Sequence, residues 1–136
     1  MTRISQLTVA FLLLSATLGS AQTPSTPIEK ETGLAAVYSN ALNGHVTASG
    51  QIYDPAKLTA AHKTLPFGTT VRVMNAANNK SVVLRINDRG PKQAARVLDI
   101  SPAAAARLGF SPRVMREVAV EIVTLGSGKT TRQPAP

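Results

Sequence analysis

The sequence contains no cysteine among its 136 residues. The chain therefore forms no disulfide bond, and its folded part must be stabilised by packing and hydrogen bonds alone. A lipoprotein signal needs a cysteine directly after the cleavage point, so we also expect no lipid anchor. Thiolate metal ligands are excluded as well, and with only two histidines we expect no metal site and no cofactor.

Long apolar runs are also lacking. The stretch Leu7–Leu18 is almost wholly apolar but has only twelve residues, whereas a membrane-spanning helix needs about 20. Arg3 precedes this stretch, and the small residues Gly19–Ala21 follow it. This is the pattern of a secretory signal, so we expect residues 1–21 to be cleaved off and the mature protein to be exported to the periplasm or beyond, without a membrane anchor.

Apolar residues are scarce at both ends of the remaining chain. Residues 22–32 carry two prolines among Thr and Ser, and residues 126–136 consist largely of Gly, Lys, Thr and Pro. Such segments bury too little apolar surface to offset the entropy lost on ordering. We expect both to be disordered and residues 33–125 to form one domain with a single modest core.

Basic residues outnumber acidic ones. Fourteen of the fifteen Lys and Arg residues and all seven Asp and Glu residues follow residue 21, so the mature chain keeps a formal charge of +7. This charge favours anionic partners, and for an exported protein these are envelope polymers such as peptidoglycan, teichoic acid or lipopolysaccharide. A solvated basic surface is the plainer alternative. Export and the 4% aromatic content argue against nucleic acid, and we expect a monomer.

Alternating and β-branched residues predict most of the strands. Residues 70–75 and 81–87 read as a hairpin with its turn at Asn78–Asn79, and further strands are expected at 34–39, 96–100 and 117–123. A helix is expected at 101–108, because Ser101 suits an N-cap, Pro102 the first helical position and Gly109 the C-terminal end.

A second helix is expected at 55–62, with Asp54 as its cap. Together these elements suggest a small closed β-barrel with helical insertions. We expect its core to comprise Val71, Val73, Val83, Leu84, Ile86, Leu98, Leu108, Val118, Val120 and Ile122.

Three polar segments stand out from the Ala- and Val-rich remainder. Thr-Ala-Ser-Gly at 47–50, Ala-Ala-His-Lys-Thr-Leu-Pro-Phe-Gly-Thr at 60–69 and Asn-Asp-Arg-Gly-Pro at 87–91 resemble the motifs of the RlpA-like double-psi β-barrel proteins. The resemblance covers about residues 34–123. It implies a mainly β fold with short helices, a six-stranded double-psi β-barrel, and lytic transglycosylase activity on peptidoglycan glycan strands with 1,6-anhydro-muramyl ends. Related barrels include expansins, which bind and loosen wall polysaccharide without clear hydrolysis.

The resemblance also implies site residues. The catalytic acid falls on Asp88, and the family's histidine falls on His62. Gln51 stands where the family usually has glutamate, and Val37–Asn40 lacks the usual aromatic-glycine pair. Asp99 resembles the second aspartate of expansin-like sites; a hydrogen-bond acceptor at the start of the helix is the alternative role. The expected substrate-binding residues are Gln51, Thr47, Tyr53, Lys63, Asn87 and Arg89.

Cleavage of a glycan strand by a lytic transglycosylase requires only one carboxylic acid, and the sequence offers Asp88. Glycoside hydrolysis normally takes two carboxylates, but a lytic transglycosylase manages with one, because the six-position hydroxyl of the sugar is the nucleophile. To donate a proton at neutral pH, Asp88 needs burial or a nearby negative charge. In a strand, Ile86 and Asp88 share a face opposite to Asn87. The alternative is that Asp88 merely orders the following Gly-Pro turn.

Two roles are open for each of the residues His62 and Tyr53. His62, expected at a helix end, either acts on substrate or binds a local carbonyl or carboxylate. Tyr53 either stacks on a sugar or belongs to the core, and His45 is expected at the surface. We expect Gln51, His62 and Asp88 to share one cleft. The protein is then a lytic transglycosylase or a non-catalytic wall-binding module in which Gln51 marks a lost carboxylate.

Overall fold

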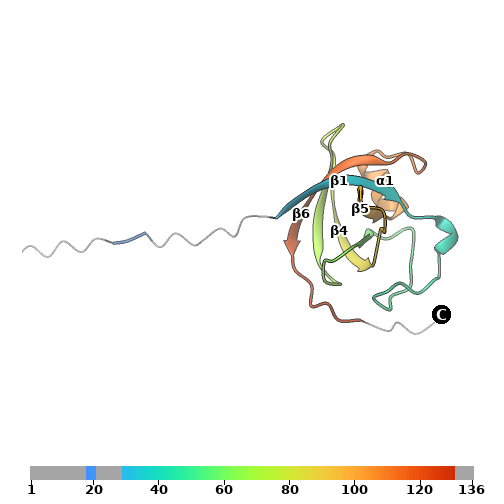
Figure 1. Cartoon of the computed structure of the whole chain (residues 1–136), viewed down its shortest axis with the longest axis horizontal. Helices are drawn as coiled ribbons and strands as arrows, with labels where there is room; N and C mark the ends of the chain where they lie inside the picture. Colours follow the sequence, from blue (N-terminus) through green and yellow to red (C-terminus); the bar gives the residue numbers. More distant parts are fainter. Residues whose placement is uncertain (1–17, 21–28, 131–136) are drawn as a thin grey trace, which may run out of the picture.

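The structure, a computed structural model, describes residues 18–20 and 29–130. Six strands close into a barrel in the spatial order β1-β5-β2-β4-β3-β6 (Figure 1). They are β1 (Lys30–Val37), β2 (Thr59–His62), β3 (Thr70–Asn75), β4 (Ser81–Asp88), β5 (Arg96–Ile100) and β6 (Arg116–Thr124). The six-stranded barrel predicted from the sequence is confirmed. Most of the predicted signal segment 1–21 lies outside the described residues.

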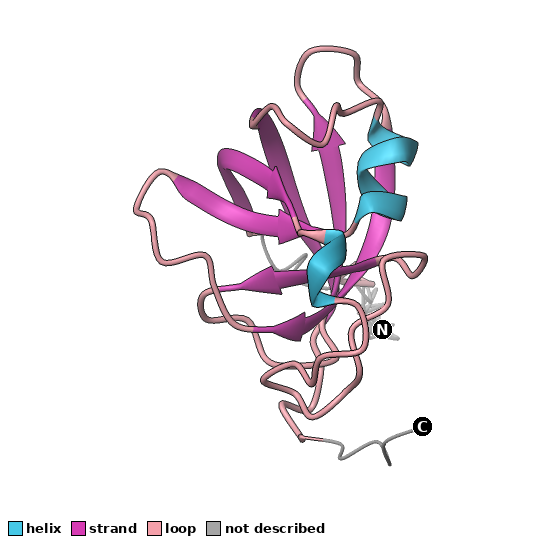
Figure 2. Cartoon of the chain, turned by 90° about the vertical axis from the view of Figure 1, so that its right-hand side faces the viewer, coloured by secondary structure: helices cyan, strands magenta, loops and turns pink. Residues whose placement is uncertain are grey.

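In the described part of the chain, one α-helix and one short 3₁₀ helix lie outside the ring of strands (Figure 2). The longer one, α1 (Pro102–Leu108), begins after Ser101, whose side chain accepts a hydrogen bond from the N–H of Ala104 at 3.2 Å. It ends at Gly109, whose φ of 73° lies in the left-handed region that glycine tolerates. The predicted helix and both of its caps are therefore confirmed. The shorter one is the 3₁₀ helix η1 (Asn40–Leu42).

The barrel combines parallel and antiparallel pairs. Strand β1 runs parallel to β5, and β2 runs parallel to β4, while the other four pairs are antiparallel. Ala61 of β2 is in register with Asp88 of β4 on one side and with Asp99 of β5 on the other. The topology therefore brings two carboxylates from distant parts of the sequence to the same end of the barrel.

The core is close to the predicted one. Eight of the ten predicted residues are buried, Ile122 is partly buried, and Val83 is 45% exposed. The prediction for Val83 is wrong because 82–84 is a continuous apolar run, which carries no alternation to show its inward side. The inward face of β4 holds Val82, Leu84 and Ile86, so Val83 points outward.

The predicted helix at 55–62 is also wrong. Asp54 accepts a hydrogen bond from the N–H of Ala56 at 2.9 Å, which forms a turn instead of a helical cap. The chain then enters β2, which fills the gap between β4 and β5. A helix here would leave the facing edges of these strands unpaired, and this tertiary pairing overrides the helical preference of the alanines.

Strand β1 begins at Lys30, earlier than either the expected strand at 34–39 or the expected domain boundary at Gly33. Residues 30–35 pair with β6, from Lys30 opposite Glu121 to Ala35 opposite Arg116. Ladder hydrogen bonds to an existing strand order these polar residues without any apolar pattern. Across the described residues, no helix is long and apolar enough to cross a membrane, and no group of three His, Asp or Glu side chains is placed to hold a metal ion.

Candidate functional site

The carboxylate of Asp88 is held by three donors at the end of β4. Its Oδ1 atom accepts hydrogen bonds from the backbone N–H groups of Ala48 and Arg89, both at 2.9 Å. Its Oδ2 atom accepts a hydrogen bond from the hydroxyl group of Tyr38. Asp88 is half-buried, so one carboxylate oxygen is fully used by the backbone and the other lies beside a phenol.

The hydroxyl group of Tyr38 is influenced by both carboxylates at this end of the barrel. Burial raises the pKa of its hydroxyl group well above the ordinary range, and the hydrogen bond to Asp88 and the negative charges of Asp88 and Asp99 raise it further. Tyr38 therefore stays protonated and remains a donor to Asp88. Asp99 itself forms an ion pair with Arg96.

A pocket of about 140 Å³ opens beside Asp88. Thr47 and Tyr53, two of the predicted substrate-binding residues, line it, and so does Tyr38, whose ring centroid lies 5.1 Å from that of Tyr53. The Tyr53 side chain is buried, and its hydroxyl group finds no hydrogen-bond partner in the described part of the chain. A buried, unpaired hydroxyl group costs free energy, and the polar character of the pocket comes instead from residues such as Asp88 and the exposed His45, which also line it.

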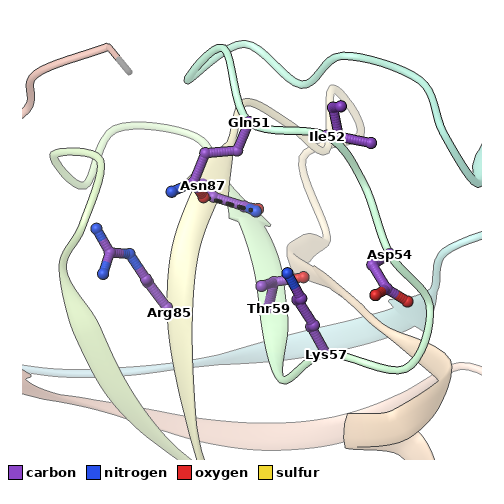
Figure 3. A pocket seen from close by; sticks show the side chains of 7 residues that line it. All are labelled: Gln51, Ile52, Asp54, Lys57, Thr59, Arg85 and Asn87. Carbon is purple, nitrogen blue, oxygen red and sulfur yellow. Dashed lines mark hydrogen bonds between the residues drawn. The ribbon is translucent and has the colours of Figure 1, made fainter. Parts of the chain in front are cut away.

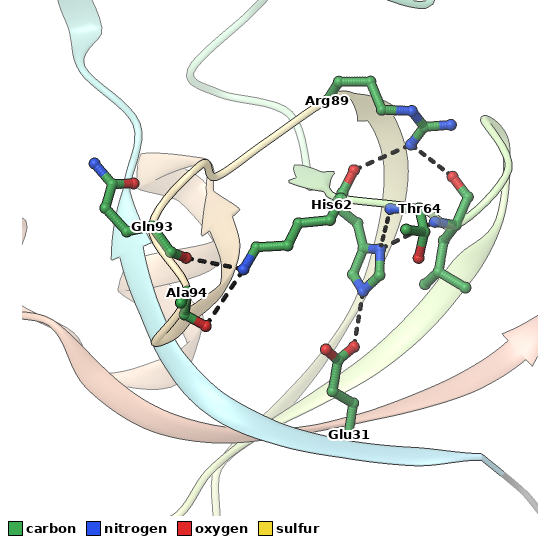
Figure 4. Close-up of polar contacts among 8 residues, drawn as sticks. Glu31, His62, Thr64, Arg89, Gln93 and Ala94 are labelled. Atoms are coloured by element: carbon green, nitrogen blue, oxygen red, sulfur yellow. Dashed lines mark hydrogen bonds and ion pairs between the residues drawn. The ribbon is translucent and has the colours of Figure 1, made fainter.

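His62 closes β2 with both ring nitrogens in use. Its Nδ1 atom accepts hydrogen bonds from the backbone N–H groups of Thr64 at 3.1 Å and Leu65 at 3.0 Å, and its Nε2 atom lies 2.8 Å from Oε2 of Glu31 (Figure 4). Because Nδ1 faces two donors, the proton of the neutral ring must sit on Nε2 and point to Glu31. The side chain is 5% exposed. Its hydrogen bonds from Thr64 and Leu65 fix the turn that follows it.

Arg89 ties this turn to Asp88. Its Nη1 atom donates to the carbonyl oxygens of His62 at 3.0 Å and Leu65 at 2.7 Å, and its guanidinium lies 4.0 Å from the ring centroid of Phe67. The predicted substrate-binding residue Lys63 is likewise engaged: its Nζ atom donates to the carbonyl oxygens of Gln93 and Ala94 (Figure 4).

Gln51 and Asn87 form a separate pair. The Nδ2 atom of Asn87 donates to Oε1 of Gln51 at 3.2 Å, and both residues line a pocket of about 420 Å³ (Figure 3). Asn87 directly precedes Asp88 in β4, and successive strand residues point to opposite faces. Gln51 is therefore grouped with Asn87 rather than with Asp88.

The structure distributes the three expected cleft residues over different pockets. Asp88 lines the pocket with Tyr38, Gln51 lines the pocket with Asn87, and His62 lines a third with Glu31. None of these three pockets contains all three side chains, and the single cleft expected from the sequence stays a prediction. The expected helix end at His62 is the end of strand β2 instead, and the carbonyl oxygen of His62 accepts a hydrogen bond from Arg89, the residue directly after Asp88.

Sequence reasoning missed three residues of this region. Tyr38 was noted only as a departure from a family motif, and Glu31 lies in the segment expected to be disordered. His45, expected at the surface, is exposed but also lines the pocket beside Asp88. No local pattern marks Tyr38 or Glu31, because each reaches its partner from a distant part of the chain.

Comparison with known proteins gives a family and several relatives. The double-psi β-barrel family described as "Lytic transglycolase" matches residues 30–124. The "Endolytic peptidoglycan transglycosylase RlpA" of Vibrio cholerae is 44% identical over 95 residues, covering 70% of this chain and 36% of that protein. The protein of the same name from Neisseria meningitidis serogroup A is 42% identical over 110 residues, covering 79% and 46%. The chain thus spans less than half the length of these relatives.

Solved structures support the fold. The Streptomyces papain inhibitor superposes with a TM-score of 0.55 at 23% identity, covering 72% of this chain and 98% of the inhibitor. An expansin of Clavibacter michiganensis superposes with the same TM-score at 16% identity, covering 71% and 51%. At such low identities these likenesses concern the barrel alone.

Proposed function

The chain belongs to the double-psi β-barrel family of lytic transglycolases, and from this premise we propose that it cleaves peptidoglycan glycan strands and leaves 1,6-anhydro-muramyl ends. The observation that carries the proposal is the placement of Asp88, a half-buried carboxylate beside a polar pocket with one oxygen committed to two backbone donors. A peptidoglycan substrate implies that the protein works in the cell envelope.

In this proposal the transferable proton belongs to one oxygen atom of Asp88. Oδ1 of Asp88 accepts from two N–H donors, so a proton on this oxygen would displace at least one of the two hydrogen bonds. The acid form therefore carries its proton on Oδ2. In the first step this proton passes to the glycosidic oxygen as the bond from that oxygen to C1 breaks. The six-position hydroxyl oxygen then bonds to C1, and its proton returns to Oδ2, which restores the acid.

The neighbouring residues support this carboxylate. Tyr38 remains a neutral donor, so it stabilises the negative charge that Oδ2 acquires between the two proton transfers. Asp99, the second carboxylate at this end of the barrel, is held in an ion pair with Arg96.

We assign His62 a positioning role. Both of its nitrogens are engaged and its side chain is buried, so a substrate oxygen has no access to a free ring position. Its contribution is to hold the turn whose carbonyl groups bind Arg89, the residue directly after Asp88.

The test is turnover of purified glycan strands, with anhydro-muramyl ends detected by mass spectrometry. Asp88→Asn preserves the acceptor for the two backbone N–H groups and removes the transferable proton. We expect it to lose turnover by about 10²–10⁴-fold while strand binding is unchanged.

A wall-binding module without catalysis is the alternative that the same experiment decides. If the wild-type protein and Asp88→Asn bind strands equally and neither produces anhydro ends, the enzyme proposal is wrong. A binding function of the kind described for expansins is then the remaining explanation.

A further inference from the structure

Segment 46–53 lines a second groove besides the pocket that contains Asp88. Gln51 and Ile52 face this groove together with Lys57 and Arg85, whereas Val46, Thr47 and Tyr53 of the same segment line the pocket beside Asp88. Arg85 also lines a small adjoining pocket that contains Lys129. We call the region defined by Lys57, Arg85, Lys129, Gln51 and Asn87 the cationic groove.

The cations of this groove are unpaired. Within residues 29–130, none of the ion pairs involves Lys57, Arg85 or Lys129. One carboxylate, that of Asp54, lines the groove, and one of its oxygens accepts the N–H of Ala56. With three cationic side chains and one carboxylate, the groove carries a net positive charge. The planar guanidinium group of arginine can donate two parallel hydrogen bonds to a ligand carboxylate.

Figure 3 shows the side chains of Arg85 and Lys57 extending from the floor of the groove toward the level of the Gln51–Asn87 hydrogen bond. Arg85 stands in β4 directly opposite Thr59 of β2. Its backbone N–H donates to the carbonyl oxygen of Leu58 at 3.1 Å. The base of the Arg85 side chain is thereby fixed by the barrel, while its guanidinium is exposed to a ligand.

Lys129 is brought to the groove by close docking of the chain after β6. The N–H of Gly126 donates to Oγ1 of Thr69 at 3.0 Å, and the N–H of Gly128 donates to the carbonyl oxygen of Phe67 at 3.1 Å. A Cβ atom on Gly126 would lie 2.2 Å from that same carbonyl oxygen, so the approach requires glycine. The segment is therefore held against the barrel, and its lysine adds to the charge beside Arg85.

The neutral part of the groove suits a sugar. The hydrogen bond from Asn87 uses Oε1 of Gln51, which leaves the N–H groups of the Gln51 amide for a ligand. Amide groups bind hydroxyl and acetamido groups well. The amides of Gln51 and Asn87 line the same groove as Lys57 and Arg85. An amino sugar that carries a carboxylate combines both kinds of group.

We propose that the cationic groove binds a carboxylate of peptidoglycan, either the lactyl carboxylate of muramic acid or a carboxylate of a stem peptide. This inference rests on the proposed function for its choice of polymer. It assigns Arg85 and Lys57 to substrate recognition. These two residues lie in the groove with Gln51 and Ile52, whereas Asp88 lies in the pocket with Val46, Thr47 and Tyr53.

The test measures binding rather than turnover, in an Asp88→Asn background that does not consume the ligand. Three probes of equal length are compared: chitin oligosaccharide, which has no carboxylate; glycan strands stripped of peptides, which have lactyl carboxylates; and peptide-bearing strands. The double variant Lys57→Gln/Arg85→Gln is matched by Lys80→Gln/Arg113→Gln, which removes the same charge from exposed residues outside the pockets described above. Thermal unfolding confirms that all variants are folded.

We expect carboxylate-bearing strands to bind more tightly than chitin oligosaccharide. The groove variant should lose this advantage by about tenfold, the size expected for two exposed ion pairs, while the control retains it. If stripped strands already bind more tightly than chitin oligosaccharide, the lactyl carboxylate is the ligand. If only peptide-bearing strands bind more tightly, the ligand is a carboxylate of the stem peptide.

The proposal is overturned if wild type prefers neither strand to chitin oligosaccharide, or if the groove and control variants lose affinity equally. Because only binding is measured, these outcomes are independent of whether the protein cleaves glycan.

Discussion

The hydroxyl group of Tyr38 donates a hydrogen bond to Oδ2 of Asp88, across 50 positions of the sequence. Tyr38→Phe removes this donor and keeps the ring that packs against Tyr53. Since hydrogen bonds to charged groups contribute about 1.5–3 kcal/mol, we expect kcat on glycan strands to fall by about ten- to a hundredfold.

Tyr53→Phe is the matched control, because Tyr53 lines the same pocket but its buried hydroxyl group makes no hydrogen bond to Asp88. It should leave the unfolding free energy unchanged or slightly raised, since no hydrogen bond is lost. Equal kcat for Tyr38→Phe and wild type would show that the phenol does not support the carboxylate.

The raised pKa of Tyr38 predicts a dependence of stability on alkaline pH. The folded state holds this proton more tightly than the unfolded state, whose tyrosines titrate near about pH 10. Above that pH the unfolded state releases the proton first, so the free energy of unfolding falls as pH rises. Urea titrations between about pH 8 and pH 11 should show a steeper loss for wild type than for Tyr38→Phe.

His62 should behave as a buried positioning residue with one tautomer. Nitrogen NMR of the neutral imidazole should show an unprotonated Nδ1 and a protonated Nε2. His62→Ala leaves the N–H groups of Thr64 and Leu65 without their acceptor and should lower the unfolding free energy by about 2–4 kcal/mol.

Glu31→Gln tests the other side of the ring, because a glutamine oxygen still accepts the Nε2 proton. We expect a much smaller loss of stability than for His62→Ala, and kcat should keep the pH profile of the wild type. A large change in that pH profile for Glu31→Gln would instead indicate that the pair transfers protons.

Gln51→Glu restores the carboxylate usual in the family. In this structure the new charge stands in the groove with Arg85, on the other side of β4 from Asp88. We expect the pH optimum of turnover to stay in place and the affinity for carboxylate-bearing strands to fall several-fold, since the glutamate competes for Arg85. A displaced pH optimum with unchanged affinity would place position 51 at the acid instead.

Local sequence patterns were sufficient for about half of the elements. The hairpin of β3 and β4 has alternating strands and an asparagine turn, with Asn79 at a positive φ of 59°, and α1 carries its own caps. Strands β5 and β6 were also predicted within one residue of their observed bounds. In each case the signal lies within about ten neighbouring residues, so no knowledge of distant contacts is required.

The sequence by itself was sufficient to predict the barrel. Its family motifs also indicated Asp88 as the candidate catalytic acid. The tertiary structure decided what surrounds that acid. The alanines of β2 form a strand because β4 and β5 offer their free edges, and polar β1 is ordered by β6. Tyr38, Glu31 and the separation of Gln51 from Asp88 follow from these pairings. Non-local hydrogen bonds leave no periodic trace in the sequence, which is why the site could be named but not assembled from it.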